Sequence, residues 1–347
     1  MKNYLIAIAL SILIIGCENS ISSNDDNNIL INDYASGSAC GGSILNFNDN
    51  VYRTTDIGIA PFDKDLNINR LERIGNFQVQ IDEGNVIYHA EKINNQIWFS
   101  LTNYSTFNQI NVVDNFSNII NTYDVGINPG DFAYWNDESS DASWVFIANE
   151  GSYGTANGSI SMIDQDGNIN ETEPLGMTVH SIEVYNNKLI VLINGDNRIK
   201  IYDISENGLA APGIEISTEN SGPREMVIVN DILYFTNQTS KDIKKLNLNT
   251  YGIESILNID GIPEDIVSDG SKLWISIPML ELYDINNGSK VIEIDIQTEQ
   301  VINSYDVGRG PEQLELFNNN LYVARKYYDN NFDWNPLFGS SKIILDR

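Results

Sequence analysis

The side chains best suited to chemistry stand at one repeated position, directly before an apolar residue that starts a strand. Both histidines of the chain occupy it, His89 just before Ala90 and His180 two residues before Ile182. Imidazole and carboxylate groups brought together can bind cations, move protons or hold a polar ligand. The candidate ligand-binding residues at this position are Tyr88, His89, Asp131, His180, Arg224, Glu225, Glu264, Asp265, Glu312 and Gln313.

Four of these residues form a candidate metal site: His89, Asp131, Glu225 and Asp265. Oxygen ligands favour Ca²⁺ as the cofactor, whereas imidazole favours a transition metal. A divalent cation there would suit a lactonase or lyase. The alternative is that polar residues suit the turns that begin strands, with Arg224 paired to neighbouring acids.

Signals for covalent catalysis are weak. A nucleophilic triad needs a histidine within reach of Ser or Cys and an orienting acid. His180 beside Ser181 does not supply that geometry by adjacency, and Cys40 has no recognisable activating context. Neither a Gly-x-Ser-x-Gly turn nor a His-Glu-x-x-His helix occurs. We therefore favour a non-catalytic binding protein.

The elements that position these residues belong to a unit that recurs about every 40 to 50 residues. A short loop leads to an apolar residue, and an aromatic residue follows eight positions later, as from Ile266 to Trp274 and from Leu314 to Tyr322. Asn, Asp and Gly residues between them are typical of hairpin turns. One four-stranded sheet cannot bury its own faces, so this repeat predicts a β-propeller.

Alignment on this spacing gives seven units, and we predict an all-β single propeller of seven four-stranded blades. Six blades are the alternative, because the first unit matches least well. The first-strand residues are Ile44, Ala90, Phe132, Ile182, Met226, Ile266 and Leu314. Their second-strand partners are Tyr52, Trp98, Trp144, Ile190, Tyr234, Trp274 and Tyr322.

Two further expectations follow from this alignment. The last unit lacks an outer strand, so residues 28–34 should close the ring beside residues 342–345 and remove an exposed sheet edge. Trp98, Trp144 and Trp274 share one repeat position and should pack between blades. Trp135 and Trp334 fall outside the pattern, which marks them as candidates for another role.

An aromatic insertion follows the second strand of the last unit, where a connection normally needs few residues. Second-to-third-strand loops share a face with the first-strand starts, so this insertion should border the same pocket. Exposed aromatics are common at binding hot spots. The alternative is that the rings fold over the last blade or plug the channel. Its candidate binding residues are Arg325, Tyr327, Tyr328, Phe332 and Trp334.

Three segments carry a family resemblance: residues 321–324 (Leu-Tyr-Val-Ala), 273–276 (Leu-Trp-Ile-Ser) and 294–298 (Ile-Asp-Ile-Gln-Thr). With the preceding Gly-x-x-Pro turns they resemble the YVTN-type propeller repeat, from about residue 40 to the C-terminus. Such propellers serve as binding platforms, scaffolds and occasionally enzymes. Surface lipoproteins of Bacteroidota are similar in plan; they capture a nutrient, cobalamin in one branch, and pass it to a TonB-dependent outer-membrane transporter. No residue here singles out cobalamin.

The N-terminus predicts export and lipid attachment. Residues 1–16 have a basic start and an apolar run too short to span a bilayer, as in a signal peptide. Ile14-Ile15-Gly16-Cys17 resembles the lipobox of bacterial lipoproteins, which implies cleavage before Cys17 and its acylation with palmitate-type chains. Residues 17–28 would then be the anchor and a polar tether, and 29–347 the propeller. The expected location is the outer membrane, at its surface or periplasmic leaflet.

The formal net charge of −28 limits which classes of partner the protein can bind. Nucleic acid is disfavoured because phosphate contacts require clustered Lys and Arg. A cationic or neutral ligand fits better. The sequence thus predicts a non-catalytic, membrane-anchored propeller that binds a small-molecule nutrient or an envelope protein on its insertion-bearing face. A metal-dependent lactonase or lyase and an envelope interaction scaffold are the alternatives.

Overall fold

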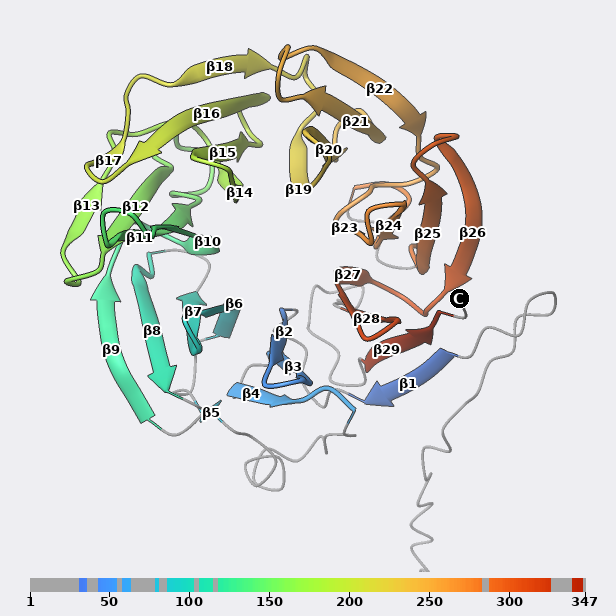
Figure 1. Cartoon of the computed structure of the whole chain (residues 1–347). Helices are drawn as coiled ribbons and strands as arrows, with labels where there is room; N and C mark the ends of the chain where they lie inside the picture. Colours follow the sequence, from blue (N-terminus) through green and yellow to red (C-terminus); the bar gives the residue numbers. More distant parts are fainter. Residues whose placement is uncertain are drawn as a thin grey trace, which may run out of the picture.

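The chain folds into a ring of small antiparallel sheets around an axis (Figure 1). The computed structural model describes residues 31–35, 43–54, 58–63, 79–80, 86–102, 106–114, 118–282, 287–325 and 339–345. All the regular elements in these ranges are β-strands, and they form seven sheets. The predicted seven-bladed propeller is confirmed, and the six-bladed alternative is wrong.

The blades follow one another in chain order, each with its first strand innermost (Figure 1). The strands of blades 1 to 3 are β2 (Ile44–Phe47), β3 (Asn50–Thr54), β4 (Gly58–Pro61) and β5 (Val79–Gln80); β6 (Val86–Ile93), β7 (Gln96–Thr102), β8 (Gln109–Asp114) and β9 (Asn118–Asp124); and β10 (Pro129–Asp137), β11 (Ala142–Asn149), β12 (Ser159–Asp164) and β13 (Ile169–Glu171).

In blade 4 the outer position is divided between two short strands that both pair with β16. The strands of blades 4 and 5 are β14 (Val179–Tyr185), β15 (Lys188–Ile193), β16 (Arg198–Ser205), β17 (Gly208–Leu209) and β18 (Ile214–Ser217); and β19 (Pro223–Val229), β20 (Ile232–Asn237), β21 (Asp242–Asn247) and β22 (Ile253–Asn258). Those of blades 6 and 7 are β23 (Ile266–Ser268), β24 (Lys272–Ile277), β25 (Lys290–Asp295) and β26 (Gln300–Asp306); and β27 (Pro311–Phe317), β28 (Asn320–Arg325), β29 (Gly339–Ile344) and β1 (Ile31–Ala35).

The N-terminal strand closes the ring, as predicted. β1 is the outer strand of blade 7 and pairs antiparallel with β29, with Ile31 opposite Ile343 and Ala35 opposite Gly339. Ile31 is 2% exposed and packs in a cluster with Val323 and Ile343. Blade 7 is therefore built from both ends of the chain, which leaves β29 paired on both sides.

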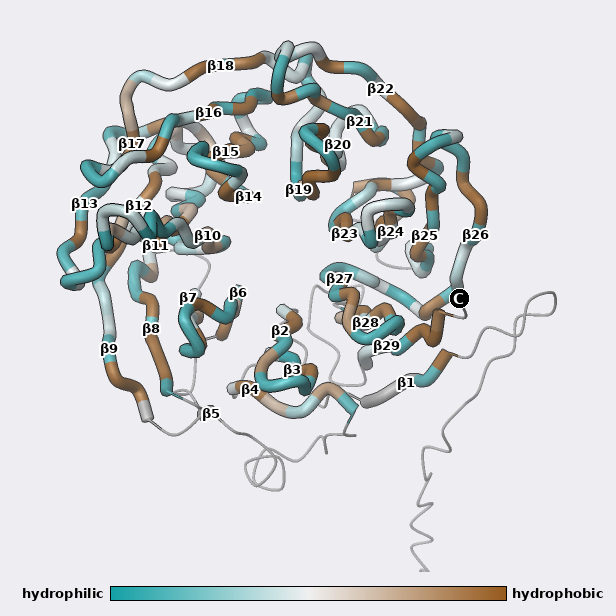
Figure 2. Tube along the Cα trace, in the orientation of Figure 1, coloured by the Kyte–Doolittle hydropathy of each residue, from teal (hydrophilic) through white to brown (hydrophobic). Residues whose placement is uncertain are grey.

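The hydrophobic core is divided among the interfaces between neighbouring blades. Seven clusters of buried side chains occur among the described residues, each drawn mainly from two adjacent blades. Apolar and polar residues alternate along many strands (Figure 2), as expected when each sheet packs on both faces. Trp98 and Trp274 lie in such clusters, as predicted.

Blade 3 requires two corrections. Its position equivalent to Trp98 is Phe146, which pairs with Ala133, while Trp144 lies two residues earlier and pairs with Trp135. The hairpin of β10 and β11 is longer than the others, so the alignment put Trp144 at the repeat position that Phe146 occupies. Trp144 nevertheless packs in the core between blades 3 and 4, as predicted. Trp135 is only 5% exposed and belongs to the core between blades 3 and 4. The expectation that it departs from the packing pattern is wrong, whereas Trp334 lies outside the described residues.

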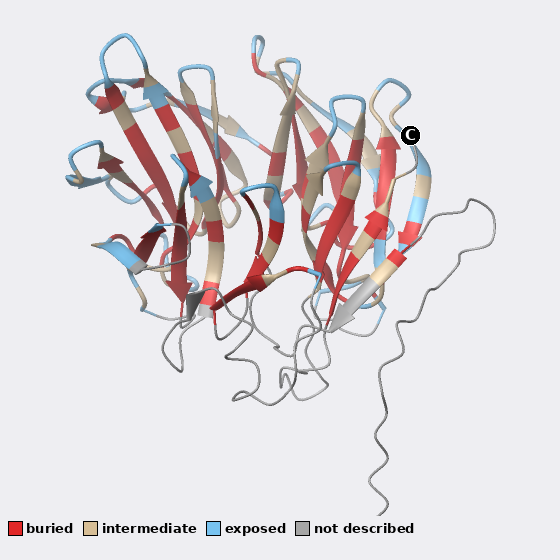
Figure 3. Cartoon of the chain, turned by 60° about the horizontal axis from the view of Figure 1, so that its bottom comes forward, coloured by how far each residue is buried: buried red, intermediate tan, exposed pale blue. Residues whose placement is uncertain are grey.

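The propeller has two distinct faces. The rim face carries the starts of the first strands and the second-to-third-strand loops. The turn face carries the hairpin turns, such as Asn94-Asn95, whose φ angles of 49° and 62° suit Asn in a tight turn. Figure 3 shows exposed turns gathered at one end of the blades. No helix in the described ranges has the length and apolar character needed to cross a membrane.

Candidate functional site

The repeated polar position forms a single cavity at the rim face. This rim pocket has a volume of about 60 Å³ and receives residues from blades 2 to 7. All ten candidates of the repeated position border it, together with one glycine: its lining is Tyr88, His89, Gly130, Asp131, His180, Arg224, Glu225, Glu264, Asp265, Glu312 and Gln313. Residues far apart in the sequence thus meet around the axis.

Backbone bulges aim these side chains at the axis. In five of the first strands the pairing with the second strand shifts inside the strand, close to the apolar residue of the repeat, as between Pro223 and Met226 or between Pro311 and Leu314. A bulge adds unpaired residues to one strand and redirects their side chains. Adjacent residues such as Arg224 and Glu225 can therefore both face the pocket, where regular alternation would separate them.

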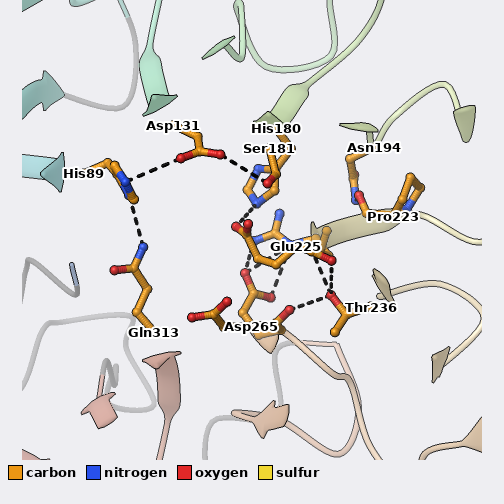
Figure 4. Close-up of polar contacts among 12 residues, drawn as sticks. His89, Asp131, His180, Ser181, Asn194, Pro223, Glu225, Thr236, Asp265 and Gln313 are labelled. Carbon is orange, nitrogen blue, oxygen red and sulfur yellow. Dashed lines mark hydrogen bonds and ion pairs between the residues drawn. The ribbon is translucent and has the colours of Figure 1, made fainter. Parts of the chain in front are cut away.

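A carboxylate outside the predicted set supports two residues of the pocket lining, Tyr88 and His180. Glu150, just after β11, accepts a hydrogen bond from the Tyr88 hydroxyl at 2.9 Å and lies 3.0 Å from His180 Nδ1. The other ring nitrogen, Nε2, is 3.1 Å from Glu225 Oε1 (Figure 4). Burial and the Arg224 charge lower the pKa of His180, but its bonds to both carboxylates outweigh them and raise it to about 9.

Arg224 forms an ion pair with a carboxylate of the next blade, Glu264. Its Nε lies 3.1 and 3.2 Å from the two oxygens of Glu264, and its Nη2 also contacts Glu264. Such a two-point contact fixes the guanidinium geometrically. Burial opposes the charge of Arg224, but Glu264 outweighs this effect and raises its pKa. This pairing is the alternative that the sequence left open for Arg224.

Two residues stand before the apolar first-strand residue of each blade, such as Glu264 and Asp265 before Ile266, and we call them a rim pair. The second residue of each rim pair often connects neighbouring blades. Its side-chain oxygen accepts a hydrogen bond from the backbone N–H of the apolar residue at the repeat position in the first strand of the next blade, a contact that we call the interblade clasp. The clasps are Ser43 to Ala90 (3.0 Å), Asp131 to Ile182 (2.8 Å), Asp265 to Leu314 (2.7 Å) and Gln313 to Ile44 (3.1 Å). Asp131 and Asp265 therefore have a structural task in holding blades together.

The four predicted metal ligands do not assemble into one ligand shell. His89 Nε2 is 3.4 Å from Asp131 Oδ1, but Glu225 pairs with His180 and Asp265 accepts backbone amides. Among the residues described, no group of three or more His, Cys, Asp or Glu side chains is arranged to hold a metal ion. The arrangement does not favour the metal hypothesis.

The protonation of His89 is linked to ring closure. Burial lowers its pKa, and the carboxylates of Glu91 and Asp131 raise it, to about 9. However, Gln313 Nε2 lies 3.3 Å from His89 Nδ1, and the Gln313 orientation is fixed because its Oε1 accepts the Ile44 N–H. An amide nitrogen only donates, so Nδ1 must be unprotonated here. Protonation of both ring nitrogens of His89 therefore requires Gln313 to turn its amide nitrogen away from Nδ1.

A larger cavity, the axial channel, continues from the rim pocket between the first strands toward the turn face. Its volume is about 570 Å³, and His89, Asp131, Glu225, Asp265 and Gln313 border both cavities. The axial channel is also lined by Glu91, Glu183 and Glu315, which sequence reasoning missed. The missed signal is alternation: Glu91 and Glu315 stand two residues after the rim residues His89 and Gln313, and Glu183 stands two residues after Ser181, so each points the same way as that residue.

The channel carboxylates repel one another. Glu183 is exposed to the water of the channel, yet enclosure by the ring wall, followed by the charges of Asp131 and Glu91, raises its pKa to about 8. Burial and the Glu91 charge raise the pKa of Glu315 to about 7. The interior of the ring is therefore a region of negative potential whose groups take up protons readily.

Several predicted residues are not at this site. Arg325 is the last residue of β28 and is not part of the rim pocket lining. Five others lie outside the described residues: Cys17, Tyr327, Tyr328, Phe332 and Trp334.

Fold and site together define a seven-bladed β-propeller with a polar rim pocket, an architecture that supports binding or scaffolding in general. Residues 143–328, more than half of the chain, match the family described as "Domain of unknown function (DUF5074)", and the chain belongs to that family. A search of the curated proteins finds no match. The resemblance to YVTN-type lipoproteins stays a prediction.

Solved structures share the fold at low sequence identity. A chain in "Crystal Structure of Mitotic Checkpoint Complex" is 10% identical with a TM-score of 0.66, covering 100% of this chain and 99% of that one. The computationally designed Ika8 protein is 10% identical with a TM-score of 0.55, covering 90% and 98%. A functionally unknown protein from Desulfotomaculum acetoxidans is 11% identical with a TM-score of 0.56, covering 89% and 100%. These likenesses show the architecture alone.

Proposed function

We propose that this protein is a non-catalytic, lipid-anchored propeller that binds a small cationic or neutral ligand in its rim pocket. One observation carries the proposal: ten polar residues from six blades, spaced along more than 200 residues of sequence, border one cavity. Concave sites with a few convergent polar groups are the usual form of small-ligand sites.

The charges of the lining favour the ligand class. The rim pocket is bordered by five carboxylates against one arginine and two histidines. Arg224 is already paired with Glu264, and His180 lies between Glu150 and Glu225. An anionic ligand would meet the carboxylates, while Arg224 and His180 already pair with carboxylates of the protein. An ammonium or hydroxyl group of a ligand would find hydrogen-bond acceptors. The rim pocket suits a small polar group, and the axial channel leaves room for more of the ligand.

The same contacts argue against acid–base catalysis at His180. An imidazole with both nitrogens facing carboxylates holds two protons at neutral pH and cannot act as a general base. The lactonase or lyase alternative also requires a metal, for which the described residues offer no suitable group. A binding role therefore uses the observed geometry more directly.

Location and partner are part of the proposal and rest on sequence. The lipobox-like segment ending at Cys17 supports acylation and attachment to the outer membrane. The YVTN-type resemblance supports delivery of a captured nutrient to a TonB-dependent transporter, and a scaffold role with an envelope protein is the alternative. Radiolabelled palmitate incorporated into the wild-type chain and absent from Cys17→Ser would support the anchor.

Native mass spectrometry of the full chain, purified in mild detergent from its host, tests ligand binding. We expect a retained small molecule with a defined mass. Gly130→Ala should weaken retention, because the new methyl group would enter the rim pocket 3.4 Å from the Tyr88 ring. Gly252→Ala is the matched control, since its methyl group would meet only Thr250, at 3.6 Å.

Two results would count against the proposal. One is a chain with no retained molecule and no rise in melting temperature with any of a panel of small amines, sugars and alcohols. The other is equal retention by Gly130→Ala and Gly252→Ala, which would place the ligand elsewhere. Retention of a protein in place of a small molecule would support the scaffold alternative.

A further inference from the structure

The way that β1 enters the ring determines which face the N-terminal segment leaves from. Ile31 pairs with Ile343, which in turn pairs with Leu321, close to the turn between β27 and β28. Ala35 pairs with Gly339 at the other end, where β29 begins on the rim face. The chain therefore enters blade 7 at the turn face, opposite the rim pocket.

The length of chain before β1 limits how the propeller can sit on a membrane. Ile31 is the fourteenth residue after Cys17, so the segment spans at most about 50 Å even when fully extended. The seven residues of β27 cover the blade from the rim face to the turn face, which corresponds to about 23 Å. Running along the outer wall of the blade would use nearly half of the maximal reach.

We infer that the turn face lies toward the bilayer and that the rim pocket opens away from it. This inference rests on the lipid anchor at Cys17 in the proposed function. With the turn face toward the membrane, the segment before Ile31 needs no detour. With the rim face toward it, the segment would have to pass the full height of blade 7, and each stretched residue loses conformational freedom.

This orientation defines the kind of partner that each face meets. The rim pocket takes its ligand from the aqueous phase. A partner embedded in the same bilayer meets the turn face, where the axial channel ends near Ile93 and Leu316. Direct transfer from the rim pocket to such a partner would require the propeller to turn over.

Site-specific fluorescence quenching on vesicles tests the orientation. The full chain, with Cys40→Ser to remove the other thiol, would carry a fluorophore at Tyr153→Cys or Gln297→Cys. Tyr153 is 97% exposed in the loop after β11 on the rim face, and Gln297 is exposed in the turn between β25 and β26 on the turn face. The acylated protein is added to phosphatidylcholine vesicles that contain a headgroup spin label.

We expect a larger fractional loss of fluorescence at residue 297 than at residue 153. Equal loss at both positions, or greater loss at residue 153, would overturn the orientation. Failure of the acylated protein to float with the vesicles would overturn it through the anchor. Neither result alters ligand retention by the rim pocket in native mass spectrometry, so the two proposals fail separately. A Cys17→Ser chain should show no loss at either position.

Discussion

Raising the pH should weaken the folded state through His180. Its side chain is 5% exposed, and its two ring nitrogens lie 3.0 Å from Glu150 Oε1 and 3.1 Å from Glu225 Oε1. Burial and Arg224 lower its pKa, but the two carboxylates raise it from 6.5 to about 9. The folded protein therefore holds a proton that the unfolded chain releases near pH 6.5.

The size and sign of the effect follow from this difference. A pKa of about 9 in place of 6.5 corresponds to roughly 3 kcal/mol as an upper bound. Because the folded pKa is raised, this stabilisation is fully present below pH 6.5 and is lost as the pH rises through about 9. Glu183 and Glu315 change stability in the same direction, since their pKa values are also raised. The wild-type curve alone therefore cannot isolate His180.

The comparison with His180→Gln isolates it. Urea unfolding below pH 6.5 and above pH 9 should show the stability advantage of wild type over the variant shrinking by up to about 3 kcal/mol. The chain has only two histidines, so each imidazole NMR signal is assigned by its loss in one variant. His89→Gln gives the corresponding measurement for the second imidazole, whose pKa is lowered by burial but raised by Glu91 and Asp131, to about 9. A His180 signal that titrates at or below pH 6.5 would refute the reasoning.

Three further perturbations test the packing and pairing. Arg224→Ala should destabilise the folded protein by roughly 2–4 kcal/mol in urea unfolding, because it leaves Glu264 unpaired. Adding Glu264→Gln should restore part of this loss. An unchanged stability of Arg224→Ala would contradict the two-point contact. Ile31→Ala should cost about 2–4 kcal/mol by loosening ring closure, with an unchanged melting temperature as the contrary outcome. Trp135→Phe removes the indole bond to Asn187, 3.0 Å long, together with one ring of a side chain that is 5% exposed. It should cost about 2–3 kcal/mol with unchanged ligand retention, whereas lost retention would give Trp135 a role in binding.

Repetition made most of the fold predictable. Every blade must bury its faces against its neighbours, so the same apolar spacing and the same Asn or Asp turns recur. A copy that matches the pattern poorly can then be aligned from the others. Ring closure was predictable because a missing outer strand at one end matched an unassigned strand at the other. Blade 3 was misaligned where its hairpin departs from the shared length, at Trp144 and Phe146.

The site was predictable only where it follows the repeat. Position relative to the strand start identified the rim residues, since each blade points that position at the axis. Glu150 was missed because it comes from the end of β11 and reaches His180 on the next blade, a contact that no spacing within one repeat encodes. The bulges were also invisible, because Pro and Gly near a strand start indicate a turn equally well.

The two residues of each rim pair have different tasks, which sharpens where ligand contacts should be sought. The second residues form interblade clasps in several blades, with Asp265 holding the Leu314 amide at 2.7 Å. Among the first residues, the Tyr88 hydroxyl donates to Glu150 and Arg224 pairs with Glu264, so both bond to side chains of neighbouring blades. The second set thus bonds to backbone amides whose positions are fixed, whereas the first set bonds to side chains that can change together with it. Ligand specificity in propellers of this plan should therefore vary with the first set, while replacement of the second set chiefly alters stability.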